Sequence, residues 1–463
     1  MIQWSADCRA GAFLCAICVA VTISFGSPAY AQVALDGSTD LWTRPTLTGD
    51  WDGLRPQLQR QGVTFSLNYT TELLANVQGG IRLGAVGDGL FQPQLDADLE
   101  KLLGLTGAKF RASGIITHGP GLTEGYVGNL ATISNIEAGP VVRLYELWYE
   151  QNAFNERFSI RGGLMIADTE FTTSEAASTF MNNTFGWNAL FSRDLPASGP
   201  AYPIPAPGLR VRVKPASDIY LQAAVFSGDP SGGNGSNQPT ELPTGTVFSF
   251  SGGAFLIGEV GYTPNQGKDA KGLPAAYKLG AWYHTSSRFG DQRFDTTGRS
   301  LADPLSNGIP FDHHGDWSIY GVIDQTLYRV PGTEEQGLAA FIRGAASPSD
   351  RNRVDAYFDT GLVYTGLIPG RPDDKIGIAA VYTKISDRAR ALDRDVAFFT
   401  GLFYPTRSAE RLVELTYRAK VAPWWTVQGD VQYVVRPSGG VLNADGSFRR
   451  NALVLGARSV VSF

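Results

Sequence analysis

Along almost its whole length this chain alternates apolar with polar residues, and no other feature of the sequence constrains the fold as strongly. The pattern is first clear in "VTFSLNYT", where Val63, Phe65, Leu67 and Tyr69 alternate with hydroxyl and amide side chains. A period of two predicts a β-strand with one apolar face, and its recurrence predicts about 16 strands. The predicted strands cover residues 63–77, 93–101, 108–117, 141–151, 157–166, 207–214, 218–227, 246–263, 277–286, 316–329, 337–346, 352–366, 375–385, 409–421, 424–436 and 450–463.

The connections between the predicted strands differ in length in a regular way. Odd-numbered connections tend to be long, such as "QGGIRLGAVGDGLFQ" and the segment after Ile166, whereas even-numbered ones tend to be short, such as "QNAFNE". The short eleventh connection "SPSDR" and the longer eighth one "TPNQGKDAKGLPAA" are exceptions. An even number of strands with this segregation is typical of outer-membrane barrels. We therefore predict an all-β fold, a transmembrane antiparallel β-barrel with short periplasmic turns and long extracellular loops.

The two faces of the predicted strands support a membrane barrel over a soluble sandwich. In "LRVRVK" the cations Arg210, Arg212 and Lys214 share one face, and in "VELTYRAKV" Glu414 and Arg418 do the same. Because an Arg or Lys facing lipid near the bilayer midplane costs about 2–4 kcal/mol, the charged faces must line water. The apolar faces then contact lipid, and closure of the sheet removes unpaired edges. A barrel of this size encloses a lumen wide enough for an aqueous channel.

The N-terminal segment carries the marks of export. "GAFLCAICVAVTISFG" has the length of a signal-peptide core, and "SPAYAQ" supplies the small residues Ala29 and Ala31 of a cleavage site. We expect a signal peptide over residues 1–31, which also contains all three cysteines of the chain. No later run of apolar residues is long enough for a transmembrane helix.

The segment 32–62 is expected to remain in the periplasm ahead of the barrel at 63–463. Within it, "GDWDGLRPQLQRQG" predicts a short helix that Asp52 caps, with Pro56 in its first turn and Gly62 at its end. The helix would lie at the periplasmic mouth. Its role, as a packed terminus or as a gate, stays open.

Composition and motifs argue against nucleic-acid binding and against catalysis. The chain has 39 Lys and Arg against 44 Asp and Glu, whereas a nucleic-acid surface needs a basic excess. It lacks HExxH, GxSxG and a phosphate-binding glycine loop. The stretch "FDHHGDW" places His313 and His314 between two aspartates, but neighbouring side chains of an extended loop diverge. We therefore expect no metal, no cofactor and no enzymatic activity.

Several stretches together resemble the carbohydrate-selective porin family, the OprB family of Gram-negative outer membranes. They are "LTGDWDGLRPQLQRQGV", "LYELWYEQ", "LMIADTEF", "FMNNTFG", "GAFLIGEVGY", "KLGAWYHTS", "GLVYTGLIPGRPDD", "VELTYRAKVAPWWTVQGDVQYVVRPSGG" and "LGARSVVSF". The resemblance implies a sixteen-stranded barrel in the outer membrane that admits mono- and small oligosaccharides. It also implies that the barrel-assembly machinery recognises the last strand, which ends at Phe463.

A pore that favours sugars needs charged side chains for directional hydrogen bonds and an aromatic ring against the apolar face of the sugar. Alternation within the strands selects the inward-facing candidates. The loop after Ile166, the third long one, is expected to fold inward and narrow the lumen. The predicted constriction consists of Arg111, Glu146, Trp148, Arg161, Trp187, Arg210, Glu259 and Trp282.

Each of these residues has a second interpretation. An inward Arg or Glu can equally belong to a ladder on the wall that sets the general field of the pore. Trp148 and Trp282 can instead serve to pack the lumen. The same alternation places Tyr145 on the lipid face together with Arg143, which we therefore expect near the rim.

The predicted function is passive diffusion of carbohydrates through a water-filled channel. A plugged barrel acting as a receptor or adhesin is the alternative, and an outer-membrane enzyme is a third possibility. The expected partners are outer-membrane lipids, the sugars as transported solutes and the assembly machinery, with no nucleic acid. Both a monomer and a homotrimer remain open.

Overall fold

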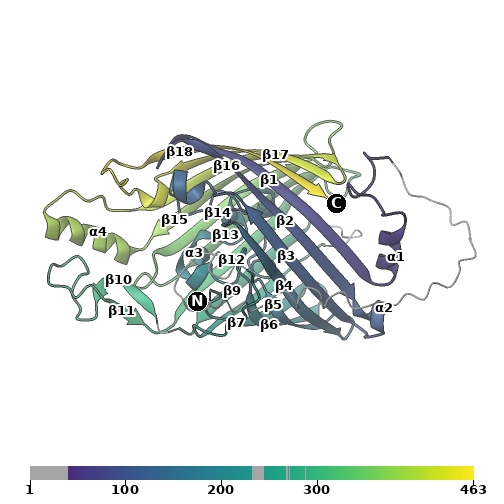
Figure 1. Ribbon diagram of the computed structural model, residues 1–463, viewed down its shortest axis with the longest axis horizontal. Helices are drawn as coiled ribbons and strands as arrows, with labels where there is room; N and C mark the ends of the chain where they lie inside the picture. The colour runs from purple at the N-terminus through teal and green to yellow at the C-terminus, as the bar shows by residue number, and fades with distance from the viewer. Residues whose placement is uncertain (1–39, 232–243, 267–269, 271, 287) are drawn as a thin grey trace, which may run out of the picture. The chain divides into compact units, whose positions relative to one another are not determined.

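The structure is a computed structural model that describes residues 40–463, apart from 232–243, 267–269, 271 and 287. Its main element is a closed barrel of 16 antiparallel strands, in which the first strand pairs with the last (Figure 1). The predicted fold class is thus confirmed. The predicted signal peptide, residues 1–31, lies outside the described residues.

Every predicted strand overlaps a strand of the barrel. The barrel strands are β1 (Val63–Gly80), β2 (Gly84–Asp98), β3 (Ala108–His118), β4 (Val141–Ala153), β5 (Phe158–Met165), β6 (Ala206–Ala216), β7 (Ile219–Ser227), β8 (Ala254–Tyr262), β9 (Ala275–His284), β12 (Asp316–Arg329), β13 (Gly337–Ala346), β14 (Val354–Thr365), β15 (Lys375–Ile385), β16 (Ala409–Ala422), β17 (Trp425–Val435) and β18 (Arg450–Ser462). A separate sheet of β10 (Phe289–Asp295) and β11 (Pro310–His313), which the sequence pattern did not predict, lies within the connection from β9 to β12.

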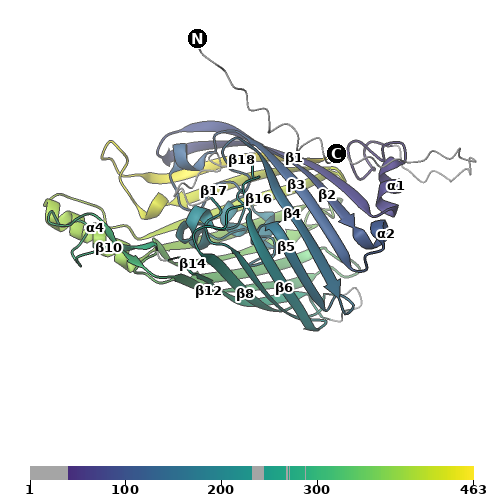
Figure 2. The ribbon, with the colours of Figure 1, turned by 60° about the horizontal axis from the view of Figure 1, so that its bottom comes forward.

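The two ends of the barrel differ as predicted. Both ribbon views place α1 (Leu54–Arg60) and α2 (Leu99–Leu103) at one end, and α4 (Asp387–Thr400) with β10 and β11 at the other (Figures 1 and 2). Short turns such as 217–218 and 423–424 lie at the end of α1 and α2. Because short turns mark the periplasmic side of such barrels, α4 belongs to the extracellular side.

The prediction of a long first connection was wrong. β1 and β2 continue to Gly80 and from Gly84, so that only residues 81–83 connect them. The glycines that suggested a loop serve close packing instead. A Cβ on Gly84 would lie 2.5 Å from the ring of Tyr126, and one on Gly89 would lie 2.1 Å from Nε2 of His118. Glycine within a strand can therefore mark a neighbouring ring and not a turn.

A helix lies in the predicted periplasmic segment, but its predicted cap was wrong. The residue that precedes α1 is Gly53, whose φ of 85° is left-handed, and no side chain caps the helix. Asp52 also has a positive φ, of 54°, which turns it out of the capping geometry. No helix among the described residues is long and apolar enough to cross a membrane.

The two faces of the strands separate as predicted. On β6 the apolar Leu209 and Val213 are 45% and 40% exposed on the outer wall, whereas Arg210 between them is 1% exposed. On β16 the neighbours Glu414 and Leu415 show the same contrast. In a soluble protein the charged side chains are exposed and the apolar ones are buried, so this distribution is reversed. It fits a barrel whose outer wall contacts lipid and whose lumen is polar.

A β-bulge in β4 makes the prediction for two residues wrong. The register between β3 and β4 shifts by one residue at Tyr145, so that alternation does not hold across that point. Tyr145 points inward and packs edge-on against Tyr202, with ring centroids 6.1 Å apart. Arg143 also points inward, is 4% exposed and donates a hydrogen bond to the carbonyl oxygen of Pro203.

Two connections fold into the barrel, as expected for the one after Ile166. The segment 166–205 contains η2 (Ala177–Thr179), η3 (Asn183–Phe185), α3 (Ala189–Asp194) and η4 (Pro196–Ser198), and we call it the inward loop. The second segment, 119–140, contains η1 (Thr123–Val127). Their apolar side chains form one buried core with the inner wall, for example where the ring of Phe180 lies 5.8 Å from that of Phe341.

Candidate functional site

Charged side chains of β2, β3 and β4 meet on the inner wall of the barrel. Nε of Arg111 lies 2.7 Å from Oδ1 of Asp96, and its Nη1 lies 3.6 Å from Oε2 of Glu146. The indole Nε1–H of Trp148 donates to Oε1 of the same glutamate at 2.9 Å. Cross-strand neighbours thus fix the orientation of the guanidinium before any solute arrives.

Trp148 lies between two arginines. Cζ of Arg161 lies 3.9 Å from the centre of the Trp148 ring and Cζ of Arg111 lies 5.1 Å from it. Cation–π attraction of this kind is worth about 0.5–2 kcal/mol. Since Trp148 is only 5% exposed, its ring supports the arginines and offers little free surface to a solute.

Glu170 of the inward loop joins the next arginines. Nη2 of Arg212 lies 2.8 Å from Oε2 of Glu170, and Nε of Arg210 lies 3.4 Å from the same oxygen. Arg161 pairs with the other carboxylate oxygen of Glu170 and, through Nε at 2.7 Å, with Glu150. Three arginines from β5 and β6 therefore hold one acidic residue of the loop.

Glu259 on β8 ends this chain of contacts. Gln222 donates through Nε2 to the backbone oxygen of Glu170 at 2.6 Å and to Oε1 of Glu259 at 3.1 Å. Glu259 accepts three further hydrogen bonds, from Oη of Tyr220 at 2.7 Å, from Oη of Tyr320 at 3.0 Å and from the backbone N–H of Thr172 at 3.0 Å. We call the connected set the lumen network. It consists of Asp96, Arg111, Glu146, Trp148, Glu150, Arg161, Glu170, Arg210, Arg212, Gln222 and Glu259.

The structure places the predicted site residues in two groups. Six of the eight predicted residues, namely Arg111, Glu146, Trp148, Arg161, Arg210 and Glu259, belong to the lumen network. Trp187 and Trp282 lie apart, both about 2% exposed, in the apolar core. Each packs edge-on against Phe191, with ring centroids 5.0 Å and 5.8 Å away. Protein covers both rings, which leaves neither of them open to a solute.

Sequence reasoning missed part of the network. Arg212 shares the face of Arg210, and Asp96 lies in an alternating strand, so strand parity alone could have selected both. Glu170 could not be found in this way, because alternation says nothing about where a long loop meets the wall.

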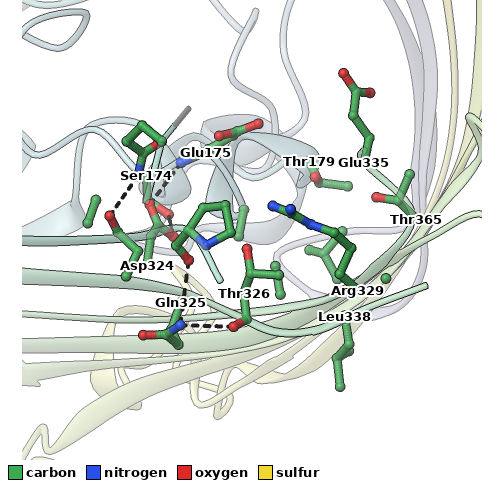
Figure 3. A pocket seen from close by; sticks show the side chains of 18 of the residues that line it. Ser174, Glu175, Thr179, Asp324, Gln325, Thr326, Arg329, Glu335, Leu338 and Thr365 are labelled. Carbon is green, nitrogen blue, oxygen red and sulfur yellow. Dashed lines mark hydrogen bonds between the residues drawn. The ribbon is translucent and has the colours of Figure 1, made fainter. Parts of the chain in front are cut away.

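A cavity of about 830 Å³ lies beside the inward loop, at the periplasmic ends of β12 to β15 (Figure 3). Oδ1 of Asp324 accepts a hydrogen bond from Oγ of Ser174 at 2.7 Å, and its Oδ2 accepts one from the N–H of Glu175 at 3.0 Å. Arg329 extends into the cavity in Figure 3. The lining combines cations, carboxylates, amides and hydroxyls, as in Lys278, Arg329, Lys375, Glu175, Asp324, Glu335, Gln325, Thr326 and Thr365.

Comparison with known proteins identifies the chain. The model of the carbohydrate-selective porin family, the OprB family, matches residues 84–463. The chain belongs to this family. Porin B of Pseudomonas aeruginosa is 29% identical over 94% of each chain, and a putative porin QuiX of Acinetobacter baylyi is 22% identical over 87% of this chain and 91% of its own. The high-pH structure of Pseudomonas putida OprB is 25% identical, with a TM-score of 0.82, over 91% of this chain and 99% of that one.

The protein is therefore an outer-membrane carbohydrate porin of a Gram-negative bacterium. The family and the fold are those of channel proteins, which agrees with a charged lumen wall and an apolar outer wall. Among the residues described here, no group of three His, Cys, Asp or Glu is placed to hold a metal ion. In the histidine pair noted in the sequence, Nε2 of His313 lies 3.0 Å from Oδ2 of Asp291.

Buried groups of the opposite wall also hold the inward loop of the porin. Glu414 on β16 accepts hydrogen bonds from the N–H groups of Met181 and Asn182, at 2.5 Å and 3.1 Å. Arg343 on β13 is paired with Asp359, and its Nη2 donates to the backbone oxygen of Thr184 at 2.9 Å. These contacts satisfy backbone groups that burial in the lumen would otherwise leave unpaired.

The segment 119–140 of the porin is held in the same way. Glu410 accepts hydrogen bonds from the N–H groups of Leu130 at 2.7 Å and Ala131 at 2.8 Å. Within the segment, Glu137 accepts from the N–H of Thr123 at 3.1 Å and from its Oγ1 at 2.7 Å. Burial raises the pKa of Glu137 to about 7. In the inward loop, burial likewise raises the pKa of Asp168 to about 6.

Proposed function

We propose that the porin passes neutral monosaccharides such as glucose, and small oligosaccharides, by passive diffusion along the lumen network. The observation that supports this is a set of charged side chains that are held in place and still partly open to the lumen. The side chains of Arg111, Asp96 and Arg212 are 30%, 33% and 31% exposed. They present fixed donors and acceptors to a polyhydroxylated solute.

We expect a sugar to bind only weakly along such a wall. The charged groups already satisfy one another, so a sugar exchanges hydrogen bonds with water and adds few of its own. An affinity near 1 mM corresponds to about −4 kcal/mol, which a few contacts supply. Weak binding is what conduction requires, because a solute held tightly stops the flow. We propose no chemical step and no energy input.

Removal of Arg111 or Glu146 tests the role of the network. We expect Arg111→Ala and Glu146→Ala each to weaken the block of single-channel current by sugar, because each breaks the contacts that fix the wall. Lys109→Ala is a matched control on β3, since this lysine is 53% exposed and its nearest carboxylate, on Glu156, is 3.8 Å away. Unchanged block in both network variants would refute the assignment.

Liposome swelling separates a channel from a plugged receptor barrel. Proteoliposomes should swell in isotonic glucose and more slowly as the sugar becomes larger. Absence of swelling with every sugar, from protein shown to be folded and inserted, would refute diffusion and favour the receptor alternative.

A further inference from the structure

Two cations lie side by side on the inner wall, outside the lumen network. Lys375 on β15 is directly opposite Arg418 on β16 in the strand register. Both face the lumen. Gly377, on the same face as Lys375, lies under the ring of Phe180, and Thr416, on the same face as Arg418, accepts a hydrogen bond from Gln428. The pair therefore lies next to residues 179–180 of the inward loop.

Neither cation is matched by a carboxylate. Within the described part of the chain, neither Lys375 nor Arg418 makes an ion pair or a side-chain hydrogen bond, although both are half-buried. Among the described residues Arg329, which lines the cavity with Lys375, also has no ion pair, whereas two other cations of the lumen have a carboxylate partner. Arg343 pairs with Asp359, and Arg458, the next cation beyond Arg418, pairs with Glu72.

The charges that face the pair leave it positive. Glu175 and Glu335 attract Lys375 across the cavity, but neither reaches ion-pair distance. Arg418 is repelled by the charge of Arg458. Arg458 is itself paired with Glu72. Like charges directly opposite each other on neighbouring strands destabilise a sheet. An unmatched pair of this kind suits a ligand of opposite charge.

We infer that Lys375 and Arg418 bind the carboxylate of an acidic sugar, an aldonate or a uronate, on its way through the porin. A guanidinium can hold a carboxylate by two parallel hydrogen bonds, and the ammonium adds a point charge beside it. The inference names a substrate class for the proposed function and rests on that function.

The surroundings favour a sugar acid over a simple anion. Lys375 lines the cavity of about 830 Å³, whose hydroxyl and amide groups include those of Thr365, Thr326 and Gln325. These groups can exchange hydrogen bonds with the hydroxyls of a sugar while its carboxylate meets the cations. Inorganic phosphate would use the charges alone.

Competition for glucose entry into proteoliposomes tests the inference. With the wild-type porin, unlabelled glucuronate should inhibit the entry of labelled glucose at a concentration at least about tenfold lower than unlabelled glucose does, because it adds charge-assisted hydrogen bonds; tenfold corresponds to about 1.4 kcal/mol. In Lys375→Gln/Arg418→Gln the two inhibitors should become equal, with glucose entry retained. Equal inhibition in the wild-type porin would overturn the inference.

Three controls keep the result specific. Lys101→Gln/Lys214→Gln removes two charges near the periplasmic rim and should keep the preference for glucuronate. Lys375→Arg/Arg418→Lys keeps both charges and should keep the preference, even if the neutral variant fails to assemble. Inhibition by phosphate as strong as that by glucuronate would overturn the assignment to a sugar acid. Wild-type protein that admits no glucose would instead refute the proposed function itself.

Discussion

Replacement of Arg343 by methionine should release the inward loop. Arg343 is 4% exposed and its partner Asp359 is fully buried. Nε of Arg343 lies 3.0 Å and 3.1 Å from the two carboxylate oxygens, while its Nη groups donate to the backbone oxygens of Thr184 at 2.9 Å and Gly186 at 3.2 Å. One side chain thus joins β13, β14 and the loop.

The size of the effect follows from what Arg343→Met leaves behind. Breaking a buried ion pair by removal of one partner costs about 3–5 kcal/mol, because the other charge stays buried. Two carbonyl groups of the loop also lose the hydrogen bonds that Arg343 donates. Since about 1.4 kcal/mol is a factor of ten, displaced states of the loop should become at least about a hundredfold more populated.

Single-channel recording and hydrogen exchange report on such states. We expect higher open-channel noise and faster amide exchange over residues 172–186. Arg343→Met/Asp359→Leu removes both charges and should recover part of the protection, since an apolar pair can replace a buried ion pair at little cost. Arg299→Met, which removes a partly exposed ion pair with Asp303, should change neither readout. Wild-type noise and exchange in Arg343→Met would refute the anchoring role.

Two further predictions concern pH and assembly. Because burial raises the pKa of Glu137 to about 7, its protonated form stabilises the folded segment 119–140. That contribution is complete below about pH 4.5, the unfolded value, and is lost as pH rises through 7, so exchange over residues 123–137 should become faster across this range and Glu137→Gln should abolish the dependence. Deletion of Phe463, whose N–H donates to the backbone oxygen of Leu67 at 2.8 Å and whose carbonyl accepts from Arg55 at 2.9 Å, should impair membrane assembly before it alters sugar selectivity. Normal yields of heat-modifiable barrel from the truncated chain would contradict that role.

The barrel was predictable because its signal is local and repeated. In β6 the alternation of Arg210 with Leu209 and Val211 predicts which face of the strand meets water. The other strands carry the same pattern, so each gives an independent prediction. The prediction for Arg143 and Tyr145 was wrong where a single inserted residue reverses the parity. No composition signal marks such a bulge, since it arises from how β3 and β4 pair.

The site was predictable only where it belongs to strands. Parity selected the inward arginines, but it could not show that Glu170 meets them, because the position of a forty-residue loop depends on contacts far apart in the sequence. The same reason explains Trp187 and Trp282. Sequence alone cannot distinguish an aromatic ring that lines a lumen from one that a loop covers.

Buried carboxylates of the lumen hold different groups on two different parts of the barrel wall. On the wall of β13 to β17, Asp359 holds Arg343 against the loop, while Glu410 and Glu414 accept backbone N–H groups of the inward segments. On the wall of β2 to β4, Asp96 and Glu146 instead hold Arg111, whose side chain stays 30% exposed to the lumen. Loss of Glu410 or Glu414 on the first wall therefore leaves backbone N–H groups of the inward segments without an acceptor. Loss of a carboxylate on the second wall leaves an arginine without its ion pair to that carboxylate.

This division makes the effects of substitutions separable. Variants of the first wall should change noise and loop exchange while sugar affinity in the open state stays the same. Variants of the second wall, such as Glu146→Ala, should change sugar block with little added noise, because the loop keeps its anchors. A porin in which both readouts always changed together would instead have one mechanical unit, and the assignment of separate roles to the two walls would fail.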